Sequence, residues 1–483
     1  MRDNFNEKAL KNLGYIEEDF KKPLVGIISH TSQIRTTSSN LSAIIENVQA
    51  GVISNGGNAI ALACPNLGGG ILSGGRYQMP AREIIADVVE SYCLENGFDA
   101  LVLIGDDNNL GAGLIMGAAR LNLPCAYISC KSGKIASIGE VLGISLFGNG
   151  TYRSFSSERL SLATQTGKAV MDAFKKQLTI RQIITVDALK NALKFNLSML
   201  SSVTVLVNLF AIAYELGINE KDFGPNILNQ ISDITPTLMA YCENFWEKFD
   251  RNGKVLAALK ELNLACSLAN TKNITGQNLF DGFKTVENLD EEFIRTKMNA
   301  YFPNSSIVLI KGNLAESGAY VKRLNFNKER LVFSGPAKVF DSEEMAQYAI
   351  NSGQLTKNDI MVIKFEGALN TGLREMDLYQ SLKRANLGED LTIITDGRIK
   401  GDLKCLTISC CSPEGLKGGY IGLVQNGDII ELNIPRFSFN AKVASKDFDK
   451  RIKQTNFPDK INKGFLKRYA DNVQDSVKGG YIK

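Results

Sequence analysis

Histidine and tryptophan are almost absent from this sequence, which has one of each in 483 residues. A single histidine, His30, excludes a histidine-rich metal site and makes any Ser-His or Cys-His nucleophile pair depend on that residue. A lone histidine at a strand end is more often a hydrogen-bonded structural group than a catalyst. The nine cysteines form no C-x-x-C pair, and their odd number indicates reduced, mostly buried thiols rather than disulfides.

Strong charge and long apolar runs are also missing. The net charge is only +4, and no basic run with interleaved aromatic residues occurs, which gives no case for nucleic-acid binding. The polar start lacks the apolar core of a signal peptide. The longest apolar helix candidate, Ser202–Gly217, contains Asn208 and Glu215 and is short for a bilayer span. We therefore expect a cytoplasmic protein that binds neither nucleic acid nor membranes.

The first part of the chain alternates apolar strands with helices. This alternation is typical of a doubly wound, mainly parallel sheet. The following residues, 156–270, are almost all helical in pattern and extend the same domain. The predicted strands are Pro23–His30, Asn58–Cys64, Asp99–Gly105 and Pro124–Cys130, and the predicted helices are Leu41–Val52, a helix opened by Pro80, and Ala112–Leu121.

Around residue 300 the pattern changes to short strands separated by glycine-rich turns. Segments such as SSIVLIKG, ERLVFSG, NDIMVIKFEG and CLTISCC are examples. Only two helices interrupt them, near 342–352 and 377–385. Many short strands with glycine turns favour a closed barrel or a sandwich.

One stretch, LIGDDNNLGAG at 103–113, places polar side chains where a strand should end and a helix begin. Two carboxylates, Asp106 and Asp107, precede two amides, Asn108 and Asn109. The carboxyl end of a parallel strand is where α/β enzymes hold ligands. The stretch is therefore either a working site or the remnant of one.

Several motifs in order along the chain carry a family resemblance. KGNLAESGAYVK, LVFSGPAKVFDSEE, FEG followed by GLREM, IITDGR and GLVQNGDIIELNIP resemble the dihydroxy-acid dehydratase and phosphogluconate dehydratase family. In the first domain, GGRYQMPAREIIAD and AARLNLP resemble it too, and so does the tail GFLKRYADNVQDSVKGG. The resemblance spans nearly the whole chain.

The resemblance implies both a fold and a chemistry. It implies an α/β dehydratase-type domain at residues 1–298, a β-barrel-like domain at 299–445, and a helical tail at 446–483 that packs on the first domain. It also implies a homodimer or dimer of dimers. Members of the family dehydrate dihydroxy or sugar acids with an iron–sulfur cluster, a Mg²⁺ ion held by carboxylates and a carbamylated lysine, and a serine base.

The thiolates of the family's [2Fe-2S] or [4Fe-4S] cluster have no counterparts in this sequence. Ser39 stands where the family has its first cluster cysteine, and Asp107 stands where it has the second. The segment with the third cysteine is deleted. Hydroxyls and carboxylates replace thiolates poorly on such clusters. Among the cysteines present, Cys64 is the best candidate for a rebuilt metal site, because it starts a glycine-rich turn.

The Mg²⁺ ligands and the base are largely replaced as well. Asn66 and Asn108 occupy the positions of two aspartates, and Asn109 that of the carbamylated lysine. Glu375 alone keeps the identity of a Mg²⁺ ligand, so Mg²⁺ is possible but weakened. Lys400 replaces the serine base.

Lys400 has several possible roles. With a depressed pKa it could act as a base or form a Schiff base, and Asp106, Asp107 and Glu375 would serve as acids or metal ligands. Alternatively it fills the space of the metal charge and pairs with Glu375 or Asp107. We weigh the second role above the first.

The sequence therefore predicts a divergent family member without an iron–sulfur cluster and with no cofactor. Its cleft would bind a small anion such as a sugar acid or keto acid, through Ser39, Asn66, Asn108, Asn109 and Arg398, or the chain would act as a partner subunit. The alternative is an active hydro-lyase or isomerase that uses Lys400 as base. A dehydratase with a relocated cluster is the third and weakest interpretation.

Overall fold

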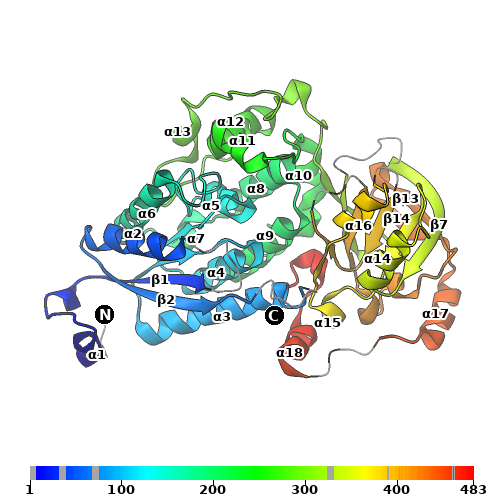
Figure 1. Ribbon diagram of the computed structural model, residues 1–483, viewed down its shortest axis with the longest axis horizontal. Helices are drawn as coiled ribbons and strands as arrows, with labels where there is room; N and C mark the ends of the chain where they lie inside the picture. Colours follow the sequence, from blue (N-terminus) through cyan, green and yellow to red (C-terminus); the bar gives the residue numbers. More distant parts are fainter. Residues whose placement is uncertain are drawn as a thin grey trace.

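The computed structural model describes residues 7–31, 40–67, 75–323, 331–388, 391–401, 403, 405–458, 461 and 463–483. Ser39, one of the predicted ligand-binding residues, lies outside these ranges. The described chain forms an α/β unit and a barrel unit that lie next to each other (Figure 1).

The N-terminal sheet is parallel, as its uninterrupted apolar strands predict. Its strands lie in the order β2-β1-β3-β4, and every neighbouring pair is parallel. Their bounds are β1 Leu24–Thr31, β2 Asn58–Pro65, β3 Ala100–Ile104 and β4 Cys125–Ile128. The carboxyl ends of all four strands therefore meet at one edge of the sheet.

Helices connect and cover these strands (Figure 1). Helix α2 packs against α6, and α3 against α4. Helix α4 begins at Asn108, four residues before the predicted start, so both amides belong to its first turn. The bounds of the helices up to α6 are α1 Glu7–Asn12, α2 Leu41–Ile53, α3 Gln78–Asn96, α4 Asn108–Leu121, α5 Lys134–Leu142 and α6 Ser157–Lys175.

The region predicted to be helical is helical and completes the N-terminal unit. Helix α9 is buried along almost its whole length, which explains why its apolar residues are not restricted to one face. The helices are α7 Ile180–Ile183, α8 Val186–Phe195, α9 Val203–Glu215, α10 Leu228–Ile234, α11 Phe245–Arg251, α12 Lys254–Cys266 and α13 Leu279–Phe283.

The C-terminal unit is a closed barrel in the order β10-β12-β6-β5-β14-β13-β7-β8, which confirms the mixed α/β and barrel prediction. A separate two-stranded parallel sheet pairs β9 (Glu375–Met376) with β11 (Arg398–Ile399). The barrel strands are β5 Ile307–Gly312, β6 Ala315–Lys322, β7 Val332–Phe340, β8 Ile360–Ile363, β10 Thr392–Thr395, β12 Leu406–Ser412, β13 Ile429–Asn433 and β14 Ser438–Ala441.

In the described residues, five α-helices follow the first barrel strand: α14 Glu343–Asn351, α15 Ala368–Thr371, α16 Tyr379–Arg384, α17 Ser445–Gln454 and α18 Gly464–Asn472. Helix α18 contacts α3 of the N-terminal unit, while α17 packs on the barrel. The buried Arg82 of α3 donates to the backbone oxygen of Gly480 at 2.8 Å, so the tail is joined to the first unit. In the described ranges, every helix is too short or too polar to span a bilayer.

Candidate functional site

A cavity of about 200 Å³ lies between the two units and collects polar side chains from both. Pockets between domains are common ligand sites, because each domain contributes one wall. Three sequence-predicted site residues, Asn108, Glu375 and Lys400, line it. The remaining lining residues are Lys134, Ser201, Ser202, Val203, Thr204, Lys322, Ile399, Gly401, Leu403, Thr407 and Ser409.

The charge of the lining is mostly positive. Lys134, Lys322 and Lys400 line the cavity together with one carboxylate among its described residues, Glu375, which leaves a formal charge of +2. Lys134 is the first residue of α5, where the helix dipole disfavours a cation. Lys322 is 9% exposed, and its Nζ lies 3.4 Å from the backbone oxygen of Gly401. A lining of this kind favours an anionic ligand.

Lys400 is held at the outer side of the cavity by an ion pair. Its Nζ lies 2.8 Å from Asp377 Oδ2, and both side chains are about half exposed. The hydrogen bond that Lys400 donates to Asp377 raises the pKa of Lys400 above its ordinary value, and the charges of Asp377 and Glu375 act in the same direction. The amine is therefore protonated at neutral pH, and its ion-pair partner is Asp377 rather than the expected Glu375 or Asp107.

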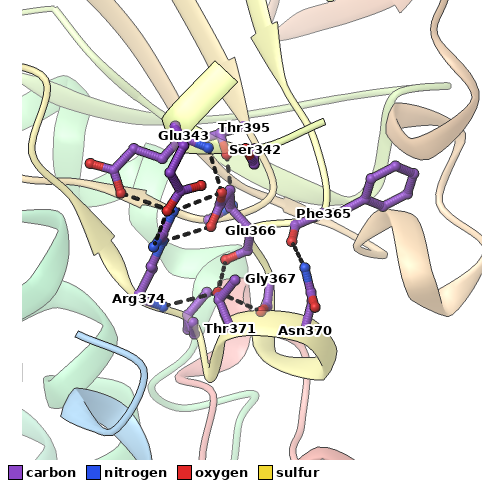
Figure 2. Close-up of polar contacts among 12 residues, drawn as sticks. Ser342, Glu343, Phe365, Glu366, Gly367, Asn370, Thr371, Arg374 and Thr395 are labelled. Carbon is purple, nitrogen blue, oxygen red and sulfur yellow. Dashed lines mark hydrogen bonds and ion pairs between the residues drawn. The ribbon is translucent and has the colours of Figure 1, made fainter. Parts of the chain in front are cut away.

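Glu375 reaches the cavity because its neighbour in the chain is firmly anchored on the other side. Figure 2 shows Arg374 surrounded by acidic side chains. Its Nε donates to Glu366 Oε2 at 2.8 Å, and its terminal nitrogens lie 3.1 Å from Glu343 and Glu344 oxygens. Arg374 directly precedes β9, so anchoring it fixes the start of the strand from which Glu375 reaches the cavity.

A short chain of hydrogen bonds crosses from the barrel unit to α9. Arg398 lies opposite Glu375 in the β9–β11 ladder. Its terminal nitrogen donates to Thr204 Oγ1 at 3.0 Å, and Thr204 Oγ1 donates to Glu375 Oε1 at 2.5 Å. Arg398 itself is fully buried and is not part of the cavity lining, so the structure places it behind Glu375 rather than against a ligand.

The carboxylate and amides at the start of α4 have structural hydrogen bonds. Asp107 is the N-cap residue, and its side chain accepts from the backbone N–H groups of Asn109 and Leu110. Asn109 is buried and accepts from Asn208 Nδ2 at 3.1 Å. Asn108 Oδ1 accepts from the backbone N–H of Ile135 at 3.2 Å, which brings the start of α5 and its Lys134 next to α4.

Asp106 and Asn66 gather around His30 at the carboxyl edge of the sheet, outside the cavity lining. His30 Nε2 accepts from the Asp106 backbone N–H at 2.9 Å, and its Nδ1 lies 3.2 Å from Asn66 Nδ2. The Asp106 carboxylate is buried, 3.2 Å from His30 Nε2 and 3.7 Å from Lys131 Nζ. This edge is a second polar cluster rather than a wall of the cavity.

All nine cysteines lie in the described ranges, each as a free thiol, and the lining of the cavity includes none of them. Burial raises the pKa of the Cys64 and Cys130 thiols to about 12, so both are protonated at neutral pH. In the parts of the chain that the structure describes, no three side chains among His, Cys, Asp and Glu are grouped closely enough to hold a metal ion.

Sequence reasoning missed eleven residues that line the cavity, and four of them matter most for its chemistry: Lys134, Ser202, Thr204 and Lys322. One signal was present for two of them, because Ser202 precedes an apolar run and is a typical N-cap residue, as the structure shows. That cap fixes the first turn of α9 and hence the position of Thr204. No sequence pattern indicated Lys134 or Lys322, because these lysines approach the cavity only through tertiary packing.

Comparisons with known proteins agree with this two-unit arrangement. The sequence models of the dihydroxy-acid/6-phosphogluconate dehydratase N-terminal and C-terminal domains match residues 22–137 with 132–282, and residues 292–480. Two proteins named dihydroxy-acid dehydratase, from Lachnospira eligens and Agathobacter rectalis, are each 33% identical over 98% and 97% of this chain and 95% of their own lengths. One from Caldanaerobacter subterraneus is 31% identical over 99% of this chain and 97% of its own length.

Proposed function

Because the chain belongs to the dihydroxy-acid/6-phosphogluconate dehydratase family, we propose that its interdomain cavity binds a small hydroxy acid or keto acid without an iron–sulfur cluster. The observation that carries this proposal is the lining itself. Lysines from both units surround a cavity that also presents serine and threonine hydroxyls. Ammonium groups bind a carboxylate, and hydroxyls bind a polyhydroxy chain.

The residues present do not fit the family's cluster. Such clusters need several thiolates, whereas none of the nine cysteines, all of which lie in the described ranges, lines the cavity. Mg²⁺ needs several charged or neutral oxygen ligands, and Glu375 shares its cavity with three lysines. Lysines in these places supply the positive charge that a metal would otherwise bring to an anionic ligand.

In this proposal different lining residues bind different groups of the ligand. Lys322 and Lys134 contribute charge at the inner walls, and Lys400 contributes it at the outer side, oriented by Asp377. Glu375 accepts a hydrogen bond from a ligand hydroxyl. Asn108 and the serine and threonine hydroxyls bind the remaining hydroxyls of the ligand.

The alternative is a hydro-lyase or isomerase in which Lys400 removes the α-proton. The names of the relatives, which are dihydroxy-acid dehydratases, favour it. A general base must lose its own proton near the working pH, and Asp377 shifts the pKa of Lys400 in the opposite direction. The contacts of Lys400 therefore support ligand binding more strongly than proton abstraction.

Calorimetric titration of the full chain tests the proposal. D-gluconate and a branched 2,3-dihydroxy acid should bind, whereas D-glucitol, the uncharged counterpart of gluconate, should not. Lys322→Gln should weaken gluconate binding roughly tenfold or more, because it removes a buried charged donor. Lys442→Gln is the matched control, since Lys442 pairs with Glu431 on the barrel surface. Equal binding of glucitol, or no binding of either acid, would overturn the proposal.

A further inference from the structure

The hydrogen-bond chain that ends at Glu375 has only one possible direction. A guanidinium group has donors and no acceptor, so at the 3.0 Å contact Thr204 Oγ1 must accept from Arg398. The threonine hydroxyl has a single proton, and that proton is then directed to Glu375 Oε1 at 2.5 Å. Glu375 Oε1 is thereby engaged as an acceptor.

Two features hold this series of hydrogen bonds in place. Arg398 is completely buried and is tied a second time by its Nε, which donates to the backbone oxygen of Leu373 at 3.1 Å. Thr204 sits in the first turn of α9, which the side chain of Ser202 caps. A buried, doubly held donor and a capped helix end leave Thr204 little freedom to turn its hydroxyl elsewhere.

The consequence for a ligand concerns the other oxygen of the carboxylate. Glu375 lines the cavity, and within the described residues the hydrogen bond that it accepts from Thr204 uses Oε1. Oε2 is therefore the oxygen offered to a ligand, and a carboxylate oxygen can only accept. A hydroxyl can satisfy it, whereas a keto oxygen in the same place is a second acceptor and is repelled.

Lys400 determines which hydroxyl of a ligand lies against Glu375. The charge of Glu375 acts on the Lys400 ammonium, so the two side chains are neighbours in the cavity wall. A ligand carboxylate bound by Lys400 places its adjacent carbon, and the oxygen on that carbon, beside Glu375. The chemistry at that carbon decides whether the contact is a hydrogen bond or a repulsion.

We propose that Thr204 is a positioning residue that makes Glu375 a selector for 2-hydroxy acids over 2-keto acids. This inference rests on the proposed anion-binding function and narrows its ligand class. Arg398 acts through Thr204, and Thr204 acts through Glu375. Discrimination arises because the half-buried Glu375 carboxylate, left facing a second acceptor, loses the hydrogen bond that a ligand hydroxyl would donate to it.

The test compares two ligands that differ only at that carbon, 2-hydroxyisovalerate and 2-ketoisovalerate, by calorimetric titration of the full chain. The wild-type protein should prefer the hydroxy acid by roughly ten- to a hundredfold. Thr204→Val should bring the ratio of the two dissociation constants close to one. Thr204→Ser, which keeps the hydroxyl, should restore the preference.

Two further variants separate this role from a general loss of structure. Thr166→Val makes the same chemical change at a buried threonine of α6, whose hydroxyl donates to the Leu162 backbone, and should keep the preference. Glu375→Gln should lose it even if Thr204→Val does not fold, because the amide can donate to a keto oxygen.

The outcomes distinguish the two proposals. Binding of both ligands with equal affinity, or a preference that survives both Thr204→Val and Glu375→Gln, would overturn the selector role and leave the anion-binding function standing. Failure of D-gluconate and of the dihydroxy acid to bind at all would overturn the anion-binding function itself.

Discussion

At the scale of single residues, the positions that the sequence singles out fall into two groups. Asn108, Glu375 and Lys400 meet in the cavity although they are far apart in the chain. Asp107 and Asn109 are adjacent to Asn108 in sequence but satisfy backbone and side-chain partners inside the first unit. Residue type alone did not separate these groups, because carboxylates and amides serve equally well as caps and as ligand contacts.

Glu140 is a buried carboxyl group whose titration affects stability. Its Oε1 accepts from the Gly150 backbone N–H at 2.6 Å, and its Oε2 has no hydrogen-bond partner in the described chain. Burial raises its pKa to about 8, from an ordinary value of 4.5. Between these values the folded protein holds a proton that the unfolded chain has lost. Rising pH therefore destabilises the fold across that window.

We expect the free energy of unfolding to fall between pH 5 and pH 8, by up to about 1.4 kcal/mol per pH unit from this group. Glu140→Gln keeps the acceptor for Gly150 and should flatten that slope in urea titrations at several pH values. Glu316→Gln, at an exposed position of β6, is the control and should leave the slope unchanged. An identical slope in Glu140→Gln would refute this assignment.

At the scale of elements, the start of α4 shows why a helix was predicted here correctly but with the wrong first residue. The predicted helix began four residues late, whereas Gly111 and Gly113 both belong to α4. They are needed for packing, since a Cβ at Gly113 would lie 2.4 Å from the Arg82 backbone oxygen, and one at Gly111 would lie 2.8 Å from the Tyr127 hydroxyl. Tertiary packing outweighed the low helix propensity of glycine.

The capping role of Asp107 leads to a prediction for this element. Asp107→Ala should lower the free energy of unfolding by about 1 kcal/mol, because two backbone N–H groups lose their acceptor. Asp107→Ser should recover most of that loss, since serine caps helices nearly as well. Both variants should bind D-gluconate like the wild type. Loss of binding in a stable Asp107→Ser variant would place Asp107 in the ligand site instead.

The apolar strands of the sheet were predictable for a different reason. A strand buried on both faces must be apolar throughout, so the runs in β1, β3 and β4 are visible without a partner. The two-residue ladder between β9 and β11 has no such signal. It owes its place to the anchoring of Arg374 and Arg398, which depends on residues far away in the chain.

At the scale of the whole molecule, the site depends on the junction of the two units. Ser201, Ser202 and Thr204 come from the N-terminal unit, while Lys322, Glu375 and Lys400 come from the barrel unit. A sequence read segment by segment predicts each unit but not which faces meet. The family resemblance identified Glu375 and Lys400 as site residues. No feature of the sequence identified Lys134 or Lys322.

The central claim is that this chain uses lysines where its family uses metal groups. The most direct test is the iron, acid-labile sulfide and magnesium content of anaerobically purified protein, measured together with its visible absorption spectrum. We expect a colourless protein with far less than one iron and one sulfide per chain. Two or more of each per chain, with charge-transfer bands in the visible spectrum, would contradict the account and show that cysteines outside the cavity hold a cluster.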